Sequence, residues 1–444
     1  MTTAELALSA ILLLTLVLQA AWPARRVLIV TSGAALSSLV ASLLGVATTS
    51  ELLADVPWDV LVVLVTLGLL SQLFAASRLF DRLAVRATRV SRGAPLATTL
   101  VFAVAMYLVS GVVNNLTALL LVLPVIHVVV RLSAPSQRYV SWTLGTVLVA
   151  CNLGGAATPI GDFPAILLLG SGSIGFGDYL VRALPITLAA LAILLALVAL
   201  VVRPARDVPF DPLSTRLTRA SIEALHRHVR IDRALLVPAA SALGAMMIAW
   251  IALPPEAGIG PELVCWIGVG GALLASRGLG ERLARVGIDS EAVLFLLSLF
   301  VMVGALARTG IFDRVALAIT TMPVPPEAQL VIFLLVAGLL TGVFSAGPSM
   351  AALLGVADAL AERLPPHAVY VGLALAVCAG SSLLLTAATS GPLAQALTDR
   401  AALRDPDGRI LRFGFFEFLP VGIMSFAVIM GCAFAWAALA MLTS

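Results

Sequence analysis

The stretch that decides the fold reads Asn152-Leu-Gly-Gly-Ala-Ala-Thr-Pro-Ile-Gly-Asp162. It interrupts an apolar segment, 139–171, that is otherwise long enough to span a bilayer. Gly154 and Gly155 permit an unwound backbone, and Pro159 removes an N–H donor and blocks continuation of the helix. Backbone that leaves helical pairing at membrane depth must be buried in protein or line a watery cavity. The stretch therefore predicts a broken membrane helix that contributes to a polar site.

The composition places the whole chain in the lipid bilayer. Of its 444 residues, 61% are hydrophobic and 11% are charged, and the mean hydropathy is +1.08. Soluble domains are about 45–50% apolar and about 25% charged. A net charge of +3 is too small to indicate nucleic-acid binding. The Cys residues form no C-x-x-C pair and the His residues no H-E-x-x-H, so neither a zinc site nor a metalloenzyme is expected.

Apolar runs and loop charge predict the topology. The uninterrupted spans expected are 4–21, 27–48, 58–75, 182–202, 234–253, 262–276, 292–307 and 414–440. Two further stretches, 95–132 and 329–363, are expected to be re-entrant helical hairpins, and 139–171 and 368–396 to be broken helices. With both termini outside, this all-α arrangement of about ten crossings places 23 of the 27 Arg on the cytoplasmic side. A bacterial inner membrane is the expected location.

An internal repeat divides the chain. Leu79-Phe-Asp-Arg-Leu-Ala84 recurs as Ile311-Phe-Asp-Arg-Val-Ala316, and other matches have nearly the same spacing. The repeats are expected at 1–202 and 234–444, with a cytoplasmic linker at 203–233. Each repeat has five predicted crossings, an odd number, so the second copy is expected to be inverted. Inverted repeats with interrupted helices are typical of secondary transporters.

The interruptions supply the candidate ion- and substrate-binding residues. In the first copy they are Ser110, Asn114, Asn115, Thr117, Asn152, Gly154, Gly155, Thr158 and Asp162. In the second copy they are Ser345, Ser349, Ser381, Ser382, Thr386 and Thr389. Neutral amide, hydroxyl and carbonyl oxygens suit Na⁺-like cations. The N-terminal end of a helix that restarts near Phe163 would instead favour an anion.

Asp162 has two interpretations. It is the one acidic residue that we place near membrane depth and away from the end of a span, so it is a candidate cation ligand or proton carrier. It also directly precedes the restarting helix, where an Asp side chain commonly caps the first N–H groups. The two roles are compatible, and the sequence leaves both open.

The Asn152–Asp162 motif, the Ser-x-x-x-Asn-Asn-x-Thr hairpin tip and the repeat plan resemble the ion transporter superfamily. Its members include divalent anion/sodium symporters, citrate carriers, NhaD-type sodium/proton antiporters and arsenite permeases. The resemblance implies a homodimeric elevator-type carrier with Na⁺ sites at the hairpin tips and helix breaks. For this chain it implies Na⁺ at Asn114, Asn115, Asn152 and Thr158. The second copy has Ser345-Ala346 where the family has an amide, which puts an equivalent second Na⁺ site in doubt.

The function expected is ion-coupled secondary transport of a small anion, a carboxylate or inorganic oxyanion, with Na⁺ or H⁺ and no other cofactor. A sodium/proton antiporter and an arsenite-type efflux permease are the alternatives. An intramembrane enzyme would need a nucleophile–base pair at depth, and no His lies close to the centre of a broken helix. The expected partners are therefore a small ionic substrate, the lipid bilayer and a second copy of the chain.

Overall fold

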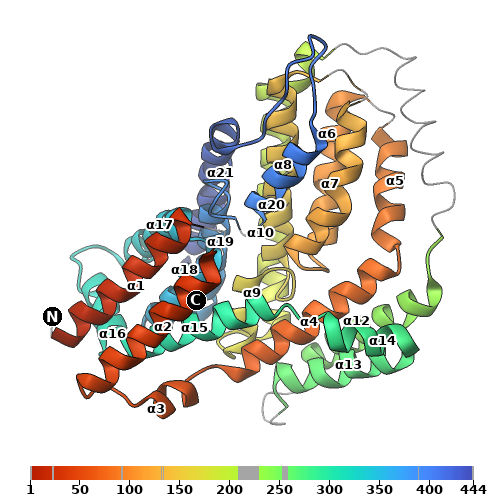
Figure 1. Ribbon diagram of the computed structural model, residues 1–444. Helices are drawn as coiled ribbons and strands as arrows, with labels where there is room; N and C mark the ends of the chain where they lie inside the picture. The colour runs from red at the N-terminus through yellow and green to blue at the C-terminus, as the bar shows by residue number, and fades with distance from the viewer. Residues whose placement is uncertain are drawn as a thin grey trace.

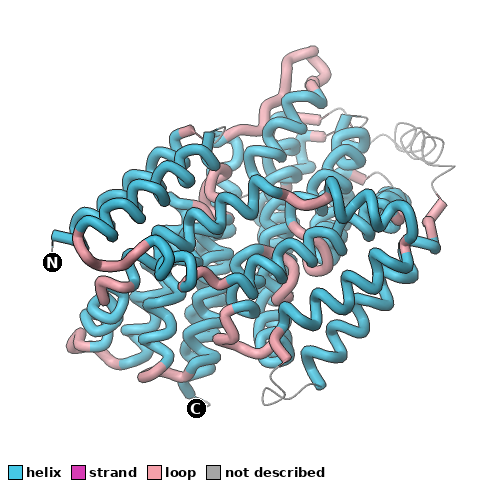
Figure 2. Tube along the Cα trace, turned by 60° about the horizontal axis from the view of Figure 1, so that its bottom comes forward, coloured by secondary structure: helices cyan, strands magenta, loops and turns pink. Residues whose placement is uncertain are grey.

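The structure is a computed structural model that describes residues 3–22, 25–91, 94–131, 133, 135–208, 230–252, 259–388 and 390–442. Within these ranges the chain is helical and forms no β-strand, apart from an isolated bridge between Arg404 and Ile410. The helices are joined mostly by short connections (Figure 2).

The helices of the first half are α1 (Thr3–Ala21), α2 (Arg26–Leu43), α3 (Thr49–Ala54), α4 (Trp58–Ala76), α5 (Leu79–Ser91), α6 (Pro95–Ser110), α7 (Asn115–Arg131), α8 (Gln137–Ala157), α9 (Phe163–Gly170) and α10 (Phe176–Leu197), followed by the short turns η2 (Val198–Val202) and η3 (Pro204–Asp207). Those of the second half are α12 (Arg233–Ala252), α13 (Pro261–Ala275), α14 (Arg277–Val286), α15 (Ser290–Ala307), α16 (Ile311–Thr320), α17 (Pro326–Phe344), α18 (Ala346–Ala361), α19 (Pro366–Ser381), α20 (Gly391–Ala401) and α21 (Phe415–Leu442). Most of the linker expected at 203–233 lies outside the described residues.

Eight helices of the described chain are long and apolar enough to cross a membrane. Two spans expected from the sequence are shorter than this: α13 has 15 residues, and the apolar part of α1 runs from Thr3 to Gln19. Conversely, the eight include α17, the first arm of an expected hairpin. The protein is therefore an all-helical membrane protein, while the count of ten crossings and the sidedness stay predictions.

The two expected hairpins are each divided into two helices that pack against each other. A turn at 111–114 separates α6 from α7, and Ser345 alone separates α17 from α18. Helix starts recur along the chain at a nearly constant spacing: Trp58 and Ser290 are 232 residues apart, and Pro95 and Pro326 are 231 apart. The relative orientation of the two halves stays a prediction.

The broken helices occupy the centre of the molecule. Of the most apolar 18 residues of each helix, 94% are buried in α8 and 22% in α12. In α19, every residue from Ala368 to Ser381 is buried. The two halves are interleaved around this centre, because α2 packs against α15 and α4 against α12 and α13 (Figure 1). Hydroxyl pairs such as Thr99–Thr143 (2.8 Å) and Tyr107–Thr187 (2.9 Å) join α6 to α8 and to α10. Such bonds between helices satisfy polar groups in the apolar interior.

Candidate functional site

The first helix break lies at 158–162, three residues later than the glycines suggested. Helix α8 continues through Gly154 and Gly155 to Ala157, and Thr158 is extended with φ −130° and ψ 150°. The expectation that the two glycines unwind the backbone is therefore wrong. Pro159 lies inside the break, where its lack of an N–H donor leaves no helical bond unmade.

The two glycines instead allow close approach. A Cβ at Gly154 would lie against the carbonyl group of Tyr107 in α6. A Cβ at Gly155 would lie 2.6 Å from Asn115 Oδ1 and 2.7 Å from Asp162 Cβ. Small residues at these positions bring α8 against the first hairpin and bring the hairpin tip beside the break.

Asp162 caps the restarting helix. Its Oδ1 accepts a hydrogen bond of 2.8 Å from the backbone N–H of Phe163, the first residue of α9. The side chain is half-buried. The capping interpretation describes the geometry, and a role in carrying a cation or proton stays a prediction.

The tip of the first hairpin is bonded to α8 and to this break. Ser110 Oγ donates to the carbonyl oxygen of Cys151 at 2.8 Å and also contacts Asn115 Oδ1. Thr158 Oγ1 donates to the carbonyl oxygen of Gly111 at 2.7 Å. Asn114 Oδ1 accepts from the N–H of Leu116 at 2.8 Å and so caps α7. Thr117 is half-buried on α7 and lines neither of the cavities described below.

The second break contacts the first. Helix α19 ends at Ser381 and α20 begins at Gly391. The amide of Asn152 donates to the carbonyl oxygen of Ser381 at 3.3 Å and to Ser382 Oγ at 3.1 Å. The Ser381 hydroxyl makes an ordinary bond of 3.0 Å within its own helix, to Cys378. Thr389 lies outside the described residues.

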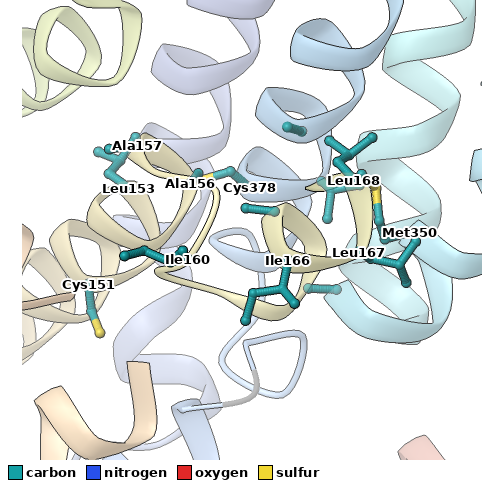
Figure 3. Close-up of a cluster of buried hydrophobic side chains, with 14 of the residues drawn as sticks. Cys151, Leu153, Ala156, Ala157, Ile160, Ile166, Leu167, Leu168, Met350 and Cys378 are labelled. Atoms are coloured by element: carbon teal, nitrogen blue, oxygen red, sulfur yellow. The ribbon is translucent and has the colours of Figure 1, made fainter. Parts of the chain in front are cut away.

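Apolar side chains pack around this polar centre. Leu153, Ala156 and Ala157 of α8, Ile160 of the break and residues 166–168 of α9 form a buried cluster with Met350 and Cys378 (Figure 3). The cluster fills the space next to the non-helical backbone of the break. It therefore meets the requirement that non-helical backbone at membrane depth be buried in protein.

Ser345 has a strained backbone at the tip of the second hairpin. Its φ is +79° and its ψ is 157°, a region that is populated almost only by glycine. Ser349, one turn into α18, is buried, and its hydroxyl has no hydrogen-bond partner among the described residues. Strain of this kind costs on the order of 1–3 kcal/mol and is concentrated at functional sites.

We expect Ser345→Gly to raise the free energy of unfolding by about 1 kcal/mol, because glycine adopts this conformation without a steric cost. The thermal midpoint of the purified protein in detergent measures the change. Ala346→Gly, one residue on and helical, is the matched control and should lower the midpoint. Equal destabilisation by both substitutions would contradict the assignment of strain to Ser345.

A cavity of about 150 Å³ gathers these elements. By the same measure a water molecule needs roughly 10–15 Å³, so there is room for several waters or a small ion. Of the predicted site residues, the cavity is lined by Asn114, Asn115, Asp162, Ser345 and Thr386. The first residues of α7, α9 and α18 and the second residue of α20 lie at or next to this lining. Four helix N-termini of the hairpins and broken helices, each with a partial positive charge, therefore surround one space.

A second cavity, of about 10 Å³, is lined in part by Asn152, Asp162, Ser381 and Tyr179. Asp162 lines both cavities. The four residues expected to bind Na⁺ are not gathered at one point: Asn114 and Asn115 line the larger cavity, Asn152 lines the smaller, and Thr158 lines neither.

The lining residues that had not been predicted from the sequence include Arg26, Asp289 and Phe295. These three come from the N-terminal parts of α2 and α15, outside the hairpins and broken helices. From the sequence, Arg26 was used only as one of the cytoplasmic Arg residues from which the topology was predicted. No local signal distinguishes it from Arg25 beside it.

Two hairpin tips and two broken central helices surround one cavity in an all-helical membrane protein, an arrangement that indicates a membrane transporter. Sequence comparison gives the same class. The chain belongs to the citrate transporter family, whose profile matches residues 10–376 and, in a second alignment, 262–443.

The chain is also similar to individual proteins. An uncharacterized transporter of Mycobacterium tuberculosis is 29% identical over 345 residues, which cover 76% of this chain and 77% of that protein. Magnetosome protein MamN of Paramagnetospirillum magneticum is 29% identical over 394 residues, covering 87% and 86%. Sodium/proton antiporter 1 of Arabidopsis thaliana is 27% identical over 294 residues, covering 64% and 48%. Among solved structures, the YdaH transporter of Alcanivorax borkumensis has a TM-score of 0.49 at 17% identity, covering 88% and 85%.

Proposed function

We propose that this protein is a secondary active transporter that moves a small anion, a carboxylate or an inorganic oxyanion, together with Na⁺ or H⁺. The observation that carries the proposal is the cavity into which both hairpin tips and the restarted ends of both broken helices converge. Helix N-termini favour an anion. The amide and hydroxyl oxygens of Asn114, Asn115 and Thr386 beside them are neutral ligands of the kind that suit a hard cation.

The proposal includes an alternating-access mechanism built on an inverted repeat. The recurring helix starts and the matched packing of α6 on α8 and α17 on α19 support two equivalent halves. In an elevator arrangement, the hairpins and broken helices would move as one body, joined by the bond from Asn152 to Ser382. The cavity reaches Arg26 and Asp289, which loop charge assigns to the cytoplasmic side, so the structure would represent a cytoplasm-facing state.

Uptake into proteoliposomes tests the proposal. Purified protein is reconstituted, and uptake of radiolabelled citrate and succinate is followed with an imposed Na⁺ gradient, an imposed pH gradient, or neither. We expect saturable uptake of at least one anion that depends on one of the gradients. Uptake that is absent for carboxylates and for phosphate or sulfate under every gradient would refute anion symport.

Sodium/proton antiport is the second candidate, because Asp162 places a carboxylate between the two cavities. A relative in Arabidopsis thaliana has this activity in its name. The internal pH of the same vesicles, followed with a trapped pH-sensitive dye, distinguishes antiport from symport. Antiport predicts that added Na⁺ changes the internal pH without any anion, whereas symport predicts a signal only when the transported anion is present.

A further inference from the structure

Arg26 is the basic side chain of the larger cavity. It is the first residue of α2, it is half-buried, and no other Arg of the described chain lines this space. Its guanidinium carbon lies 5.9 Å from the centre of the Phe295 ring of α15. This cation–π contact holds the guanidinium against the cavity wall. The ring face does not accept hydrogen bonds from the N–H groups of the guanidinium in the way that an oxygen would. Among the described residues, these N–H groups have no hydrogen-bond acceptor.

The position of Arg26 is electrostatically unfavourable without a ligand. A cation at a helix N-terminus opposes the helix dipole, which favours negative charge there. The preceding residue, Arg25, makes no side-chain capping bond to α2. The Arg26 guanidinium and uncapped N–H donors thus occupy one helix end, and an anion in the cavity would compensate for them.

The acidic residues of the cavity do not supply that compensation. Asp162 accepts from the N–H of Phe163 at 2.8 Å, and Asp289 accepts from the N–H of Ala292 at 3.0 Å. The Asp162 carboxylate therefore caps the N-terminus of α9, and the Asp289 carboxylate caps that of α15. Neither forms an ion pair with Arg26 in the described structure.

We infer that Arg26 binds an anionic group of the transported substrate, held in place by Phe295. The inference rests on the proposed anion transport and extends it, because it assigns recognition to a residue outside the hairpins and broken helices. A guanidinium presents a planar fork of donors, which fits a carboxylate through two parallel hydrogen bonds. A small di- or tricarboxylate would place one carboxylate at Arg26 and the rest toward the hairpin tips.

Kinetics of Arg26→Gln test the inference in the reconstituted system. Loss of a charge-assisted hydrogen bond weakens binding roughly 10- to 100-fold, so we expect the KM for radiolabelled citrate to rise by this factor, while dependence on the ion gradient is retained. Arg26→Lys, which keeps the charge and loses the fork, should give an intermediate KM. Arg25→Gln removes an equal charge from the neighbouring exposed residue, which does not line the cavity, and should leave the KM within about twofold of the wild-type value.

The outcomes separate this inference from the function on which it rests. If the wild-type protein transports citrate or succinate and Arg26→Gln has the same KM, the role of Arg26 is refuted and anion transport stands. If Arg25→Gln raises the KM as much as Arg26→Gln, the effect is general surface charge, and the specific role is refuted. If the wild-type protein transports no anion, the proposed function fails first. A thermal midpoint at or above that of the wild type in each variant shows that a changed KM does not arise from misfolding.

Discussion

Asp162→Asn is expected to reduce ion-coupled transport at least tenfold while leaving the fold intact. Asparagine caps a helix about as well as aspartate, so the bond to the Phe163 N–H can be kept and α9 can begin at the same residue. The substitution removes the negative charge from the place where the two cavities meet. Loss of a charged ligand costs about 1.5–3 kcal/mol, which corresponds to roughly a 10- to 100-fold weaker interaction with the coupling ion.

The measurement is the gradient-driven initial rate of uptake and the ion concentration that gives half of its maximum. Asp232→Asn is the matched control. Asp232 also accepts from a backbone N–H at the start of a helix, that of Ala234 at 3.0 Å, but it is exposed and does not line the cavity. Asp162→Ala, which removes charge and cap together, should additionally lower the thermal midpoint. An unchanged ion dependence in Asp162→Asn would exclude Asp162 from coupling and reduce it to a cap.

The breaks were predictable from the sequence because they are marked by residues that oppose a helix. Within apolar runs, Pro159 and the Gly391-Pro392 pair are strong local signals, and the structure is non-helical at 158–162 and 382–390, with Thr389 outside the described residues. The restart of α9 at Phe163 follows from the Asp162 cap. These features depend on neighbours in the chain, which one sequence displays.

The conformation at Gly154 and Gly155 was not predictable in the same way. Glycine is found both in unwound backbone and at close contacts between helices, and the sequence does not show which of these two roles applies here. The position of α6 against α8 in the structure shows that Gly154 allows a close contact between the two helices. Likewise, the contact of Arg26 with Phe295 joins residues 269 positions apart, and nothing local to either one indicates it.

Gly154→Ala is expected to destabilise the protein strongly. The new methyl group would lie against the carbonyl oxygen of Tyr107 and 2.9 Å from its carbonyl carbon and Cα. These are backbone atoms of α6, so no side chain can rotate away, and α6 and α8 must separate. Overpacking of an interior costs about 1–3 kcal/mol, and we expect the upper end of this range.

Separation of α6 from α8 would also displace residues of the candidate binding site. The stability of this helix contact is therefore linked to transport. The tip of the first hairpin follows α6 directly. Ser110 holds it to α8, and Thr158 holds it to the break. Gly154→Ala should therefore lower both the thermal midpoint and the rate of uptake. Gly431→Ala in α21 is the control: no atom lies within 4 Å of its Cβ position, and alanine is the better helix former. Its midpoint should equal or exceed that of the wild type, and an equal loss in both variants would contradict the close-packing role of Gly154.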